Sequence, residues 1–291
     1  MNAIHDAQQD SLFDSLGDHE SATRCSVANA QVLIGTSGYS FDDWKGTYYP
    51  SSLPNKDMLD YYARDFSIVE INASYYRLLP SKTYESMLDR VPKDFRFVVK
   101  AYEGLTHRRE LDDSIVRQFE QSVRPLTDAH RLEAVLLQFP WSFRHTPENT
   151  DRLIQLVYHF PTLRLAAEFR NNTWAIPQME RLLHDSRVAF CCVDEPRLEG
   201  LMPNFSLATR KDLGYVRLHG RNAKHWWKGG ALRYDYDYSD QELAEWADKI
   251  QSLVKKTGRV LTFFNNCHLG QAVKNAKSLR ELLNERGLKV T

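Results

Sequence analysis

The sequence predicts an α/β protein built as a single (β/α)8 TIM barrel. Short apolar segments alternate eight times with segments patterned as amphipathic helices, an alternation typical of parallel strands joined by right-handed crossovers. Eight such units in about 260 residues match a closed barrel in length and number. An open, doubly wound sheet usually carries a glycine-rich phosphate turn after its first strand, and residues 35–38, Gly-Thr-Ser-Gly, do not match that pattern.

Each predicted strand is a short apolar run that ends in polar or turn-forming residues. The eight strands cover residues 32–35, 67–72, 95–100, 134–138, 165–170, 188–194, 214–219 and 259–265. The predicted helices cover residues 57–65, 81–90, 112–128, 147–159, 177–185, 240–256 and 271–284. Ser81 is suited to an N-cap and Pro177 to a first helical turn. A long connection is expected between the sixth and seventh strands.

Composition sets the class of protein. We expect residues 31–291 to form the barrel domain and the polar, acidic residues 1–30 to form a flexible tail. Net charge is zero, with 42% apolar and 26% charged residues, so no global field attracts nucleic acid or membrane. Because no signal peptide and no run of about 18 apolar residues is visible, we expect a cytoplasmic protein without a membrane span. The cysteines lack metal-site spacing, which favours free thiols, at Cys25, Cys191, Cys192 and Cys267.

Strand alternation predicts polar side chains inside the barrel. Apolar residues of a barrel strand face the helices, so residues of opposite parity face the interior. In the seventh strand, Val216 and Leu218 face outward, whereas Arg217 and His219 face inward. The polar residues assigned to the interior are Glu70, Asn72, Lys100, Gln138, Glu168, Arg170, Asp194, Arg217, His219, Asn265 and Asn266. Nearly all lie at the carboxyl ends of their strands, the face on which barrel enzymes build active sites.

These interior residues predict a functional site. Buried ion pairs add little net stability, so a structural plug does not require so many charged or titratable groups. The candidate acid–base residues are Glu70, Glu168, Asp194 and His219. The candidate anion-binding residues are Lys100, Arg170 and Arg217. A structural ion-pair network remains the alternative, in which Glu168 and Arg170 are each other's counter-ions.

Loop residues extend the predicted substrate site. His107 follows the third strand and is a second titratable candidate, with a solvated loop histidine as the alternative. Arg221 follows the seventh strand. Tyr39, Tyr75 and Trp174 lie near strand ends, where aromatic rings either stack on sugars and bases or cover the core.

The segment of residues 209–233 combines basic and aromatic residues. It contains seven Lys or Arg residues against one Asp, interleaved with Tyr215, Trp226 and Trp227. Arginines and rings together suit a phosphate-bearing ligand, and loops after the seventh and eighth strands often bind phosphate in barrels. A solvated charged loop is the alternative.

A set of ordered motifs resembles a known family. They are Ile34-Gly-Thr-Ser-Gly-Tyr, Val69-Glu-Ile-Asn72 with Tyr75-Tyr76, Thr106-His107, Gln138-Phe-Pro140, Glu168-Phe-Arg170 with Trp174, Arg217-Leu-His-Gly-Arg221 and Phe264-Asn-Asn266. From about residue 32 to 282 the chain resembles the YecE-like family, also called domain of unknown function 72 (DUF72). The resemblance implies a (β/α)8 barrel and supplies no established reaction. Thr173, where Ser is expected, and Cys267 depart from the family pattern.

The resemblance also raises comparison with metal-dependent barrel endonucleases. A trinuclear metal site needs many His and carboxylate ligands, and His219 is the only histidine at a predicted strand end. We therefore predict no metal cluster and no cofactor. A single divalent ion is left open, with candidate ligands Glu70, Glu168, Asp194 and His219.

The leading hypothesis is a hydrolase or lyase that acts by acid–base chemistry on a small anionic, phosphate-bearing or sugar-like substrate. A glycosidase using Glu70 and Glu168 across a cleft is a narrower variant. The alternative from another class is a nucleic-acid-binding, nuclease-like protein that uses residues 209–233. A non-catalytic small-ligand sensor is the third. The sequence does not specify the substrate or the oligomeric state.

Overall fold

The computed structural model describes residues 31–291, and the predicted tail of residues 1–30 lies outside the described residues. The parallel strands of the described chain are β1 (Gln31–Thr36), β2 (Ile68–Ile71), β3 (Arg96–Lys100), β4 (Leu132–Gln138), β5 (Leu165–Glu168), β6 (Val188–Asp194), β7 (Gly214–Leu218), β8 (Arg259–Phe264) and β9 (Lys289–Val290). Their order in the sheet is β2-β3-β4-β5-β6-β7-β8-β1-β9. The α/β barrel predicted from the sequence is therefore confirmed, with each of the eight predicted strands present.

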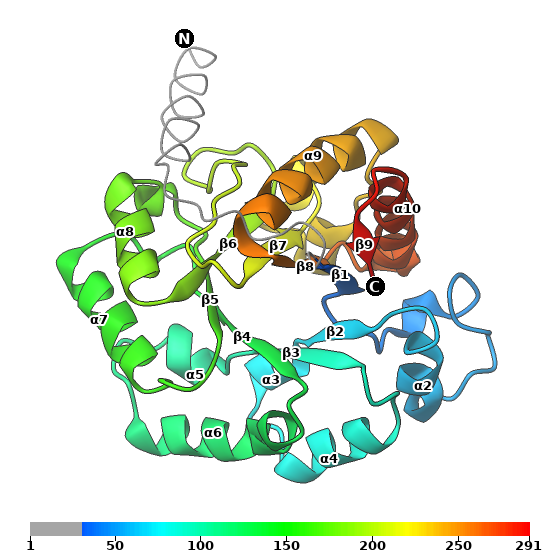
Figure 1. Cartoon of the computed structure of the whole chain (residues 1–291), viewed down its shortest axis with the longest axis horizontal. Helices are drawn as coiled ribbons and strands as arrows, with labels where there is room; N and C mark the ends of the chain where they lie inside the picture. The colour runs from blue at the N-terminus through cyan, green and yellow to red at the C-terminus, as the bar shows by residue number, and fades with distance from the viewer. Residues whose placement is uncertain (1–30) are drawn as a thin grey trace.

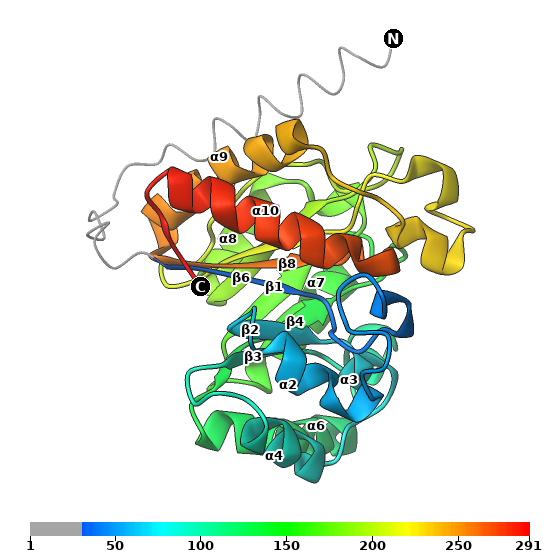
Figure 2. The same cartoon turned by 90° about the vertical axis from the view of Figure 1, so that its right-hand side faces the viewer.

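Helices surround the curled sheet. They are α2 (Met58–Tyr62), α3 (Ala73–Tyr76), α4 (Ser81–Asp89), α5 (Glu103–Thr106), α6 (Asp113–Asp128), α7 (Pro147–Tyr158), α8 (Pro177–Asp185), α9 (Asp240–Thr257) and α10 (Gln271–Glu285). Figure 1 shows α4, α6, α7, α8, α9 and α10 around the outside of the strands. Figure 2 shows α9 and α10 on one side of the sheet and α4 and α6 on the opposite side.

Local sequence explains where several helices begin and end. Asp112 caps α6 by accepting a hydrogen bond from the Ser114 backbone N–H. Ser239 and Glu242 form a reciprocal capping box at the start of α9. Predicted and observed boundaries differ by a few residues, which is usual where helix and strand ends fray. The short helices α3 and α5 and the last strand, β9, were not predicted, because segments of two to four residues carry no measurable periodicity.

The barrel closes between β1 and β2 through a narrow contact. A single parallel bridge joins Ser37 and Glu70, and the Gly38 N–H donates to the Glu70 carbonyl oxygen at 2.8 Å. At the amino end, β9 pairs with β1 instead. The two strands approach so closely that a Cβ at Gly35 would overlap the Ile68 carbonyl oxygen. Glycine is therefore required at residue 35 for this closure.

Apolar side chains fill the space between strands and helices. Val216 and Leu218 of β7 are fully buried, as are Trp246 of α9 and Leu279 of α10. The interior at the carboxyl ends of the strands is different, because buried Glu70, Glu168 and other polar groups replace apolar side chains there. This polar layer lies on the face where barrel enzymes build their active sites.

Candidate active site at the carboxyl ends of the strands

Arg217 is the centre of the buried polar layer. It projects from β7 and donates hydrogen bonds of 2.6 Å from Nη1 to Glu168 Oε2 and of 2.6 Å from Nη2 to Glu70 Oε1. Nη2 also contacts Ser37 Oγ at 3.2 Å, and Tyr215 donates a 2.6 Å bond to Glu70 Oε2. The guanidinium, both carboxylates and the Ser37 and Tyr215 side chains are buried. Two carboxylates therefore share one arginine, which leaves neither of them free.

Glu168 also holds a second arginine. Arg170 Nε lies 2.6 Å from Glu168 Oε1, and the Arg170 side chain is 14% exposed at the barrel mouth. Burial raises the pKa of Glu168, but the positive charges of Arg170 and Arg217 outweigh burial and hold that pKa well below its ordinary value. Glu168 is consequently a permanent carboxylate at neutral pH. The prediction that Glu168 and Arg170 are mutual counter-ions agrees with this geometry.

His219 lies beside the same carboxylate. Its Nε2 is 3.3 Å from Glu168 Oε1 and 3.1 Å from Arg170 Nη2, and its Nδ1 is 2.9 Å from Asn265 Nδ2. Burial, followed by the positive charge of Arg170, lowers the pKa of His219 to about 3. The imidazole is therefore neutral and packed at neutral pH.

Asp194 does not face the barrel interior, so its predicted place in the site is wrong. The Cys191 thiol contacts the inward-facing Glu168. Because side chains alternate along a strand, the odd-numbered residues of β6 face inward and the even-numbered ones face outward. Asp194 faces α9 and pairs with Arg221, whose Nε lies 3.0 Å from both carboxylate oxygens. The fully apolar run of β6 gave no alternation from which this direction could be deduced.

Glu195 occupies the place that was assigned to Asp194. Arg170 Nη1 donates a 2.8 Å hydrogen bond to Glu195 Oε2, and the Met202 N–H donates to Glu195 Oε1 at 3.1 Å. Burial raises the pKa of Glu195 to about 7, against the opposing charge of Arg170. The signal in the sequence that points to Glu195 is the pair of adjacent acids, Asp194 and Glu195, at the end of an apolar strand.

Lys100 forms a second cluster with Tyr75 and His107, all three of them predicted site residues. Lys100 Nζ lies 4.0 Å from the centre of the Tyr75 ring, and the His107 and Tyr75 ring centres are 5.1 Å apart. Burial and then Arg217 lower the pKa of Lys100 to about 7. Burial and then Lys100 lower the pKa of His107 to about 4. Among residues 31–291, Lys100 Nζ has neither a hydrogen bond nor a carboxylate partner.

Asn72 and Gln138 complete the half-buried wall of the mouth. Asn72 follows β2 and Lys100 ends the neighbouring strand, where Ile71 pairs with Val99. The buried Asn72 Oδ1 has no hydrogen-bond partner in the described part of the chain. Gln138, opposite Glu168 in the register of β4 and β5, donates to the Phe139 carbonyl oxygen at 2.8 Å. Within residues 31–291, the mouth therefore has the Lys100 ammonium without an ion-pair partner and the Asn72 Oδ1 without a hydrogen-bond donor.

The remaining predicted binding residues lie away from the mouth. Trp174 is fully buried, stacks on Phe169 at 4.3 Å between ring centres and donates to the Phe143 carbonyl oxygen. Asn266 is buried and donates to Asn275 Oδ1 of α10 at 2.7 Å. These side chains pack the core and join the helix layer, so neither contacts the surface of the site.

Tyr39 and Arg221 also face the helix layer. Burial raises the pKa of Tyr39; the charge of Arg90 lowers it and that of Asp60 raises it, each by less than burial does. Arg221 joins Asp194 to α9, where its Nη1 lies 3.0 Å from Glu242 Oε1. The Tyr39 ring lies 6.3 Å from the Tyr62 ring of α2, so Tyr39 and Arg221 each have partners in the helix layer.

The basic segment of residues 209–233 does not form one continuous surface. Three of its arginines are engaged by acids: Arg210 by Asp212, Arg217 by the buried carboxylates and Arg221 by Asp194. Trp226 is buried and lies 5.6 Å from the Arg170 guanidinium, while Trp227 is half exposed against Trp141, with ring centres 5.7 Å apart. Lys224 and Lys228 are exposed.

The candidate single-ion ligands are already paired, Glu70 and Glu168 with Arg217 and Asp194 with Arg221. Over residues 31–291, no three or more His, Cys, Asp or Glu side chains are grouped so that they could hold a metal ion. No helix in that part of the chain is both long and apolar enough to cross a membrane. Cys191, Cys192 and Cys267 are buried free thiols, as predicted, and Cys25 lies outside the described residues.

Comparisons with known proteins agree with the fold. The UPF0759 protein YunF of Bacillus subtilis (strain 168) is 33% identical over 270 residues, which cover 87% of this chain and 94% of YunF. A DUF72 family protein from Thermotoga maritima MSB8 has a solved structure with a TM-score of 0.82 and 36% identity, covering 87% of this chain and 99% of that one. A DUF72 family protein from Enterococcus faecalis V583 has a TM-score of 0.76 and 27% identity, covering 88% and 98% of the two chains.

The family model described as "Protein of unknown function DUF72" matches residues 33–291. This match covers the barrel domain except residues 31 and 32, and it includes every motif on which the sequence resemblance was based. The chain therefore belongs to the DUF72 family.

Proposed function

We propose that the protein is a hydrolase or lyase that acts by acid–base chemistry on a small anionic, phosphate-bearing or sugar-like substrate at the carboxyl ends of the strands. The observation that carries this proposal is the state of Lys100. Its ammonium group lacks a carboxylate partner among residues 31–291, while Arg217 and Arg170 engage Glu70, Glu168 and Glu195. An anionic substrate supplies the missing partner.

Two groups titrate in the range that acid–base catalysis at neutral pH requires. The pKa of Lys100 is about 7, so its ammonium form attracts an anion and its amine form accepts a proton. The pKa of Glu195 is also about 7, and Arg170 connects this carboxyl to the mouth. In this proposal Lys100 is the catalytic residue and Glu195 is a positioning residue that acts through Arg170.

Glu168, Glu70 and His219 have structural roles in the same scheme. Glu168 stays ionised and His219 stays neutral at neutral pH, so neither exchanges a proton in that range. They orient Arg170 and Arg217, and rigid support of this kind is what keeps a catalytic group in place. Asn72 Oδ1 remains available to accept a hydrogen bond from a substrate hydroxyl or amide.

The glycosidase variant is not supported. It requires two carboxylates that face each other across an open cleft. The Arg217 guanidinium occupies the space between Glu70 and Glu168 and bonds to both at 2.6 Å. No sugar ring can lie between these two groups without displacing the arginine.

The test is ligand binding and turnover with a panel of sugar phosphates and sugar acids. Lys100→Met removes the cation, and Lys100→Arg keeps a positive charge that does not titrate near neutrality. We expect Lys100→Arg to bind like the wild type without turnover, and Lys100→Met to lose about tenfold or more in affinity, because one charge-assisted contact is worth roughly 1.5–3 kcal/mol. Lys224→Met, at an exposed position in the basic segment, is the matched control.

Each other outcome has a definite meaning. Wild-type affinity and turnover in Lys100→Met would reject the proposal, and binding without turnover by the wild type would identify a sensor. Nucleic-acid binding through residues 209–233 remains a prediction. It would require oligonucleotide affinity that falls steeply with salt and is lost in Lys224→Glu combined with Lys228→Glu.

A further inference from the structure

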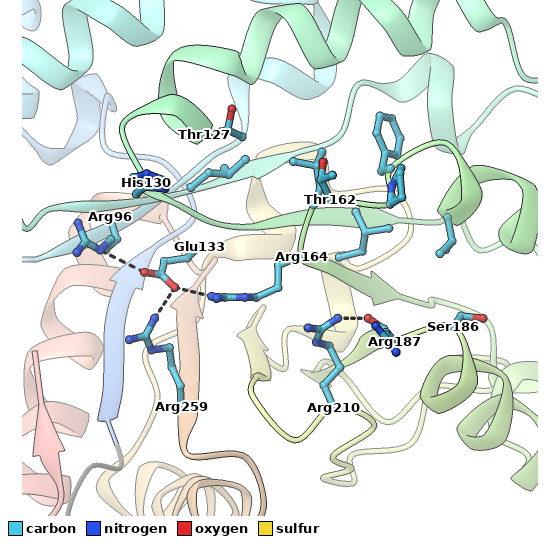
Figure 3. Close-up of a pocket in the computed structure, with 16 residues that line it drawn as sticks. Arg96, Thr127, His130, Glu133, Thr162, Arg164, Ser186, Arg187, Arg210 and Arg259 are labelled. Carbon is cyan, nitrogen blue, oxygen red and sulfur yellow. Dashed lines mark hydrogen bonds and ion pairs between the residues drawn. The ribbon is translucent and has the colours of Figure 1, made fainter.

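A cavity of about 600 Å³ lies at the amino ends of the strands, opposite the candidate active site. Figure 3 shows that its charged lining comes from separate units of the barrel. Arg96 begins β3, Glu133 lies on β4, Arg164 precedes β5, Arg187 precedes β6 and Arg259 begins β8. Its size falls within the roughly 300–1,000 Å³ that small-molecule sites occupy.

One buried carboxylate serves three of these arginines. Glu133 Oε2 lies 2.7 Å from Arg259 Nη1 and 3.2 Å from Arg164 Nη1, and Glu133 Oε1 lies 3.2 Å from Arg96 Nε. The Glu133 side chain is only 7% exposed. Because a carboxylate carries one negative charge, this group leaves a positive excess around the cavity.

Of the other two arginines, Arg187 adds to that excess, whereas Arg210 is paired with a carboxylate. Arg210 forms a bidentate pair with Asp212, with both contacts at 2.8 Å, and Arg164 Nε lies 3.5 Å from the same carboxylate. The Arg187 side chain has no ion-pair or hydrogen-bond partner in residues 31–291, since Arg210 contacts only its backbone carbonyl oxygen. Five arginines thus surround the cavity against two carboxylates.

Two residues that line the cavity have a left-handed backbone conformation. His130 and Arg187 directly follow the C-caps of α6 and α8 with φ of 54° and 56°, and both line the cavity. Left-handed positions of this kind usually carry glycine, because a side chain there costs about 1 kcal/mol. At the left-handed positions that follow α9 and α10 the chain has glycine, Gly258 and Gly287, and neither residue lines the cavity.

We propose that this cavity binds a small molecule that carries a di- or polyphosphate group. A guanidinium group can donate two hydrogen bonds to a phosphate group. The arginines around the cavity carry more positive charge than its carboxylates neutralise, which favours a ligand with several negative charges. Apolar Leu132, Leu163 and Leu165 line the same cavity and provide contact area for a non-phosphate portion. The site is independent of the chemistry proposed at the opposite end of the barrel.

The test is calorimetric titration of the 291-residue protein with inorganic pyrophosphate. Arg187→Gly removes the unpartnered guanidinium and relieves the left-handed strain, so folding is retained or improved. We expect saturable binding by the wild type and a loss of about tenfold or more in Arg187→Gly, since each tenfold corresponds to about 1.4 kcal/mol. Lys211→Ala removes an exposed positive charge nearby that does not line the cavity and should change affinity less than about twofold, as expected for a solvent-screened charge.

Four results would overturn the proposal. The first is no saturable binding of pyrophosphate at low salt, and the second is an equal loss of affinity in Arg187→Gly and Lys211→Ala, which would indicate a diffuse surface field. The third is pyrophosphate binding that is lost in Lys100→Met and unchanged in Arg187→Gly, which would place the ligand at the barrel mouth. Tighter binding of a single-stranded oligonucleotide that depends on Arg187 would assign the cavity to nucleic acid instead.

Discussion

Lys100 Nζ lies 4.0 Å from the centre of the Tyr75 ring and has this aromatic face where a carboxylate would be expected. A cation over a ring is stabilised by a few tenths to about 2 kcal/mol, less than an ion pair within hydrogen-bond distance provides in the same surroundings. Protonation of Lys100 in the folded protein therefore costs free energy. This cost leads to a measurable dependence of stability on pH.

Lys100→Met is expected to stabilise the protein at pH 6 and to lose that advantage at high pH. The pKa of Lys100 falls from 10.5 to about 7 on folding, so charging it opposes folding fully below pH 7 and not at all well above 10.5. The gain in the free energy of unfolding should be roughly 2–4 kcal/mol at pH 6 and should shrink from pH 7 to pH 10. Urea unfolding at several pH values measures it, and a gain that does not vary with pH would contradict the assignment.

Glu168→Gln and His219→Gln are expected to differ sharply in stability. Glu168→Gln leaves Arg170 and Arg217 without a shared carboxylate and should cost about 3–5 kcal/mol at neutral pH, as for other broken buried ion pairs. His219 is neutral, with a pKa of about 3, so an amide that keeps its hydrogen bonds should cost only about 1 kcal/mol.

The same comparison has a pH signature. The folded pKa of Glu168 lies well below 4.5, so its stabilising contribution is fully present above pH 4.5 and is lost as pH falls below that value. Wild type and Glu168→Gln should therefore converge in acid. Chemical unfolding of the wild type and both variants at pH 7 and at pH 3 or below tests this, because the contribution of Glu168 is lost only as pH falls from 4.5 towards its folded pKa. Equal costs for the two substitutions at pH 7 would show that the charge network is not the source of the effect.

Gly35→Ala is expected to weaken barrel closure between β1 and β2. The added methyl group would meet the Ile68 backbone carbonyl oxygen, which cannot move without shifting the strand. We expect a loss of at least about 2 kcal/mol in the free energy of unfolding, at the upper range of overpacking effects. At Gly230 no atom lies within 4 Å of an added Cβ, so Gly230→Ala should cost only about 1 kcal/mol, from its positive φ. Similar costs at both positions would contradict the steric explanation.

Alternation along a strand predicted side-chain direction only where one face was polar. In β7 and the residue that follows it, apolar Val216 and Leu218 alternate with Arg217 and His219, and the structure has both polar residues inside, as predicted. In β6 both faces are buried and apolar, so no alternation in the sequence shows which residues face the interior. The prediction that Asp194 faces inward was wrong for this reason. Glu195 was missed for the same reason.

The sequence by itself determined the strand and helix alternation, the family, and the polar character of the carboxyl ends of the strands, because these depend on local periodicity and on motifs within single segments. Tertiary structure decided which charges meet. Arg217 and Ser37 are 180 residues apart in sequence, and Arg259 and Glu133 are 126 apart, yet each pair is in contact. Barrel closure and strand stagger determine such distances, and both are properties of the whole sheet that no single segment encodes.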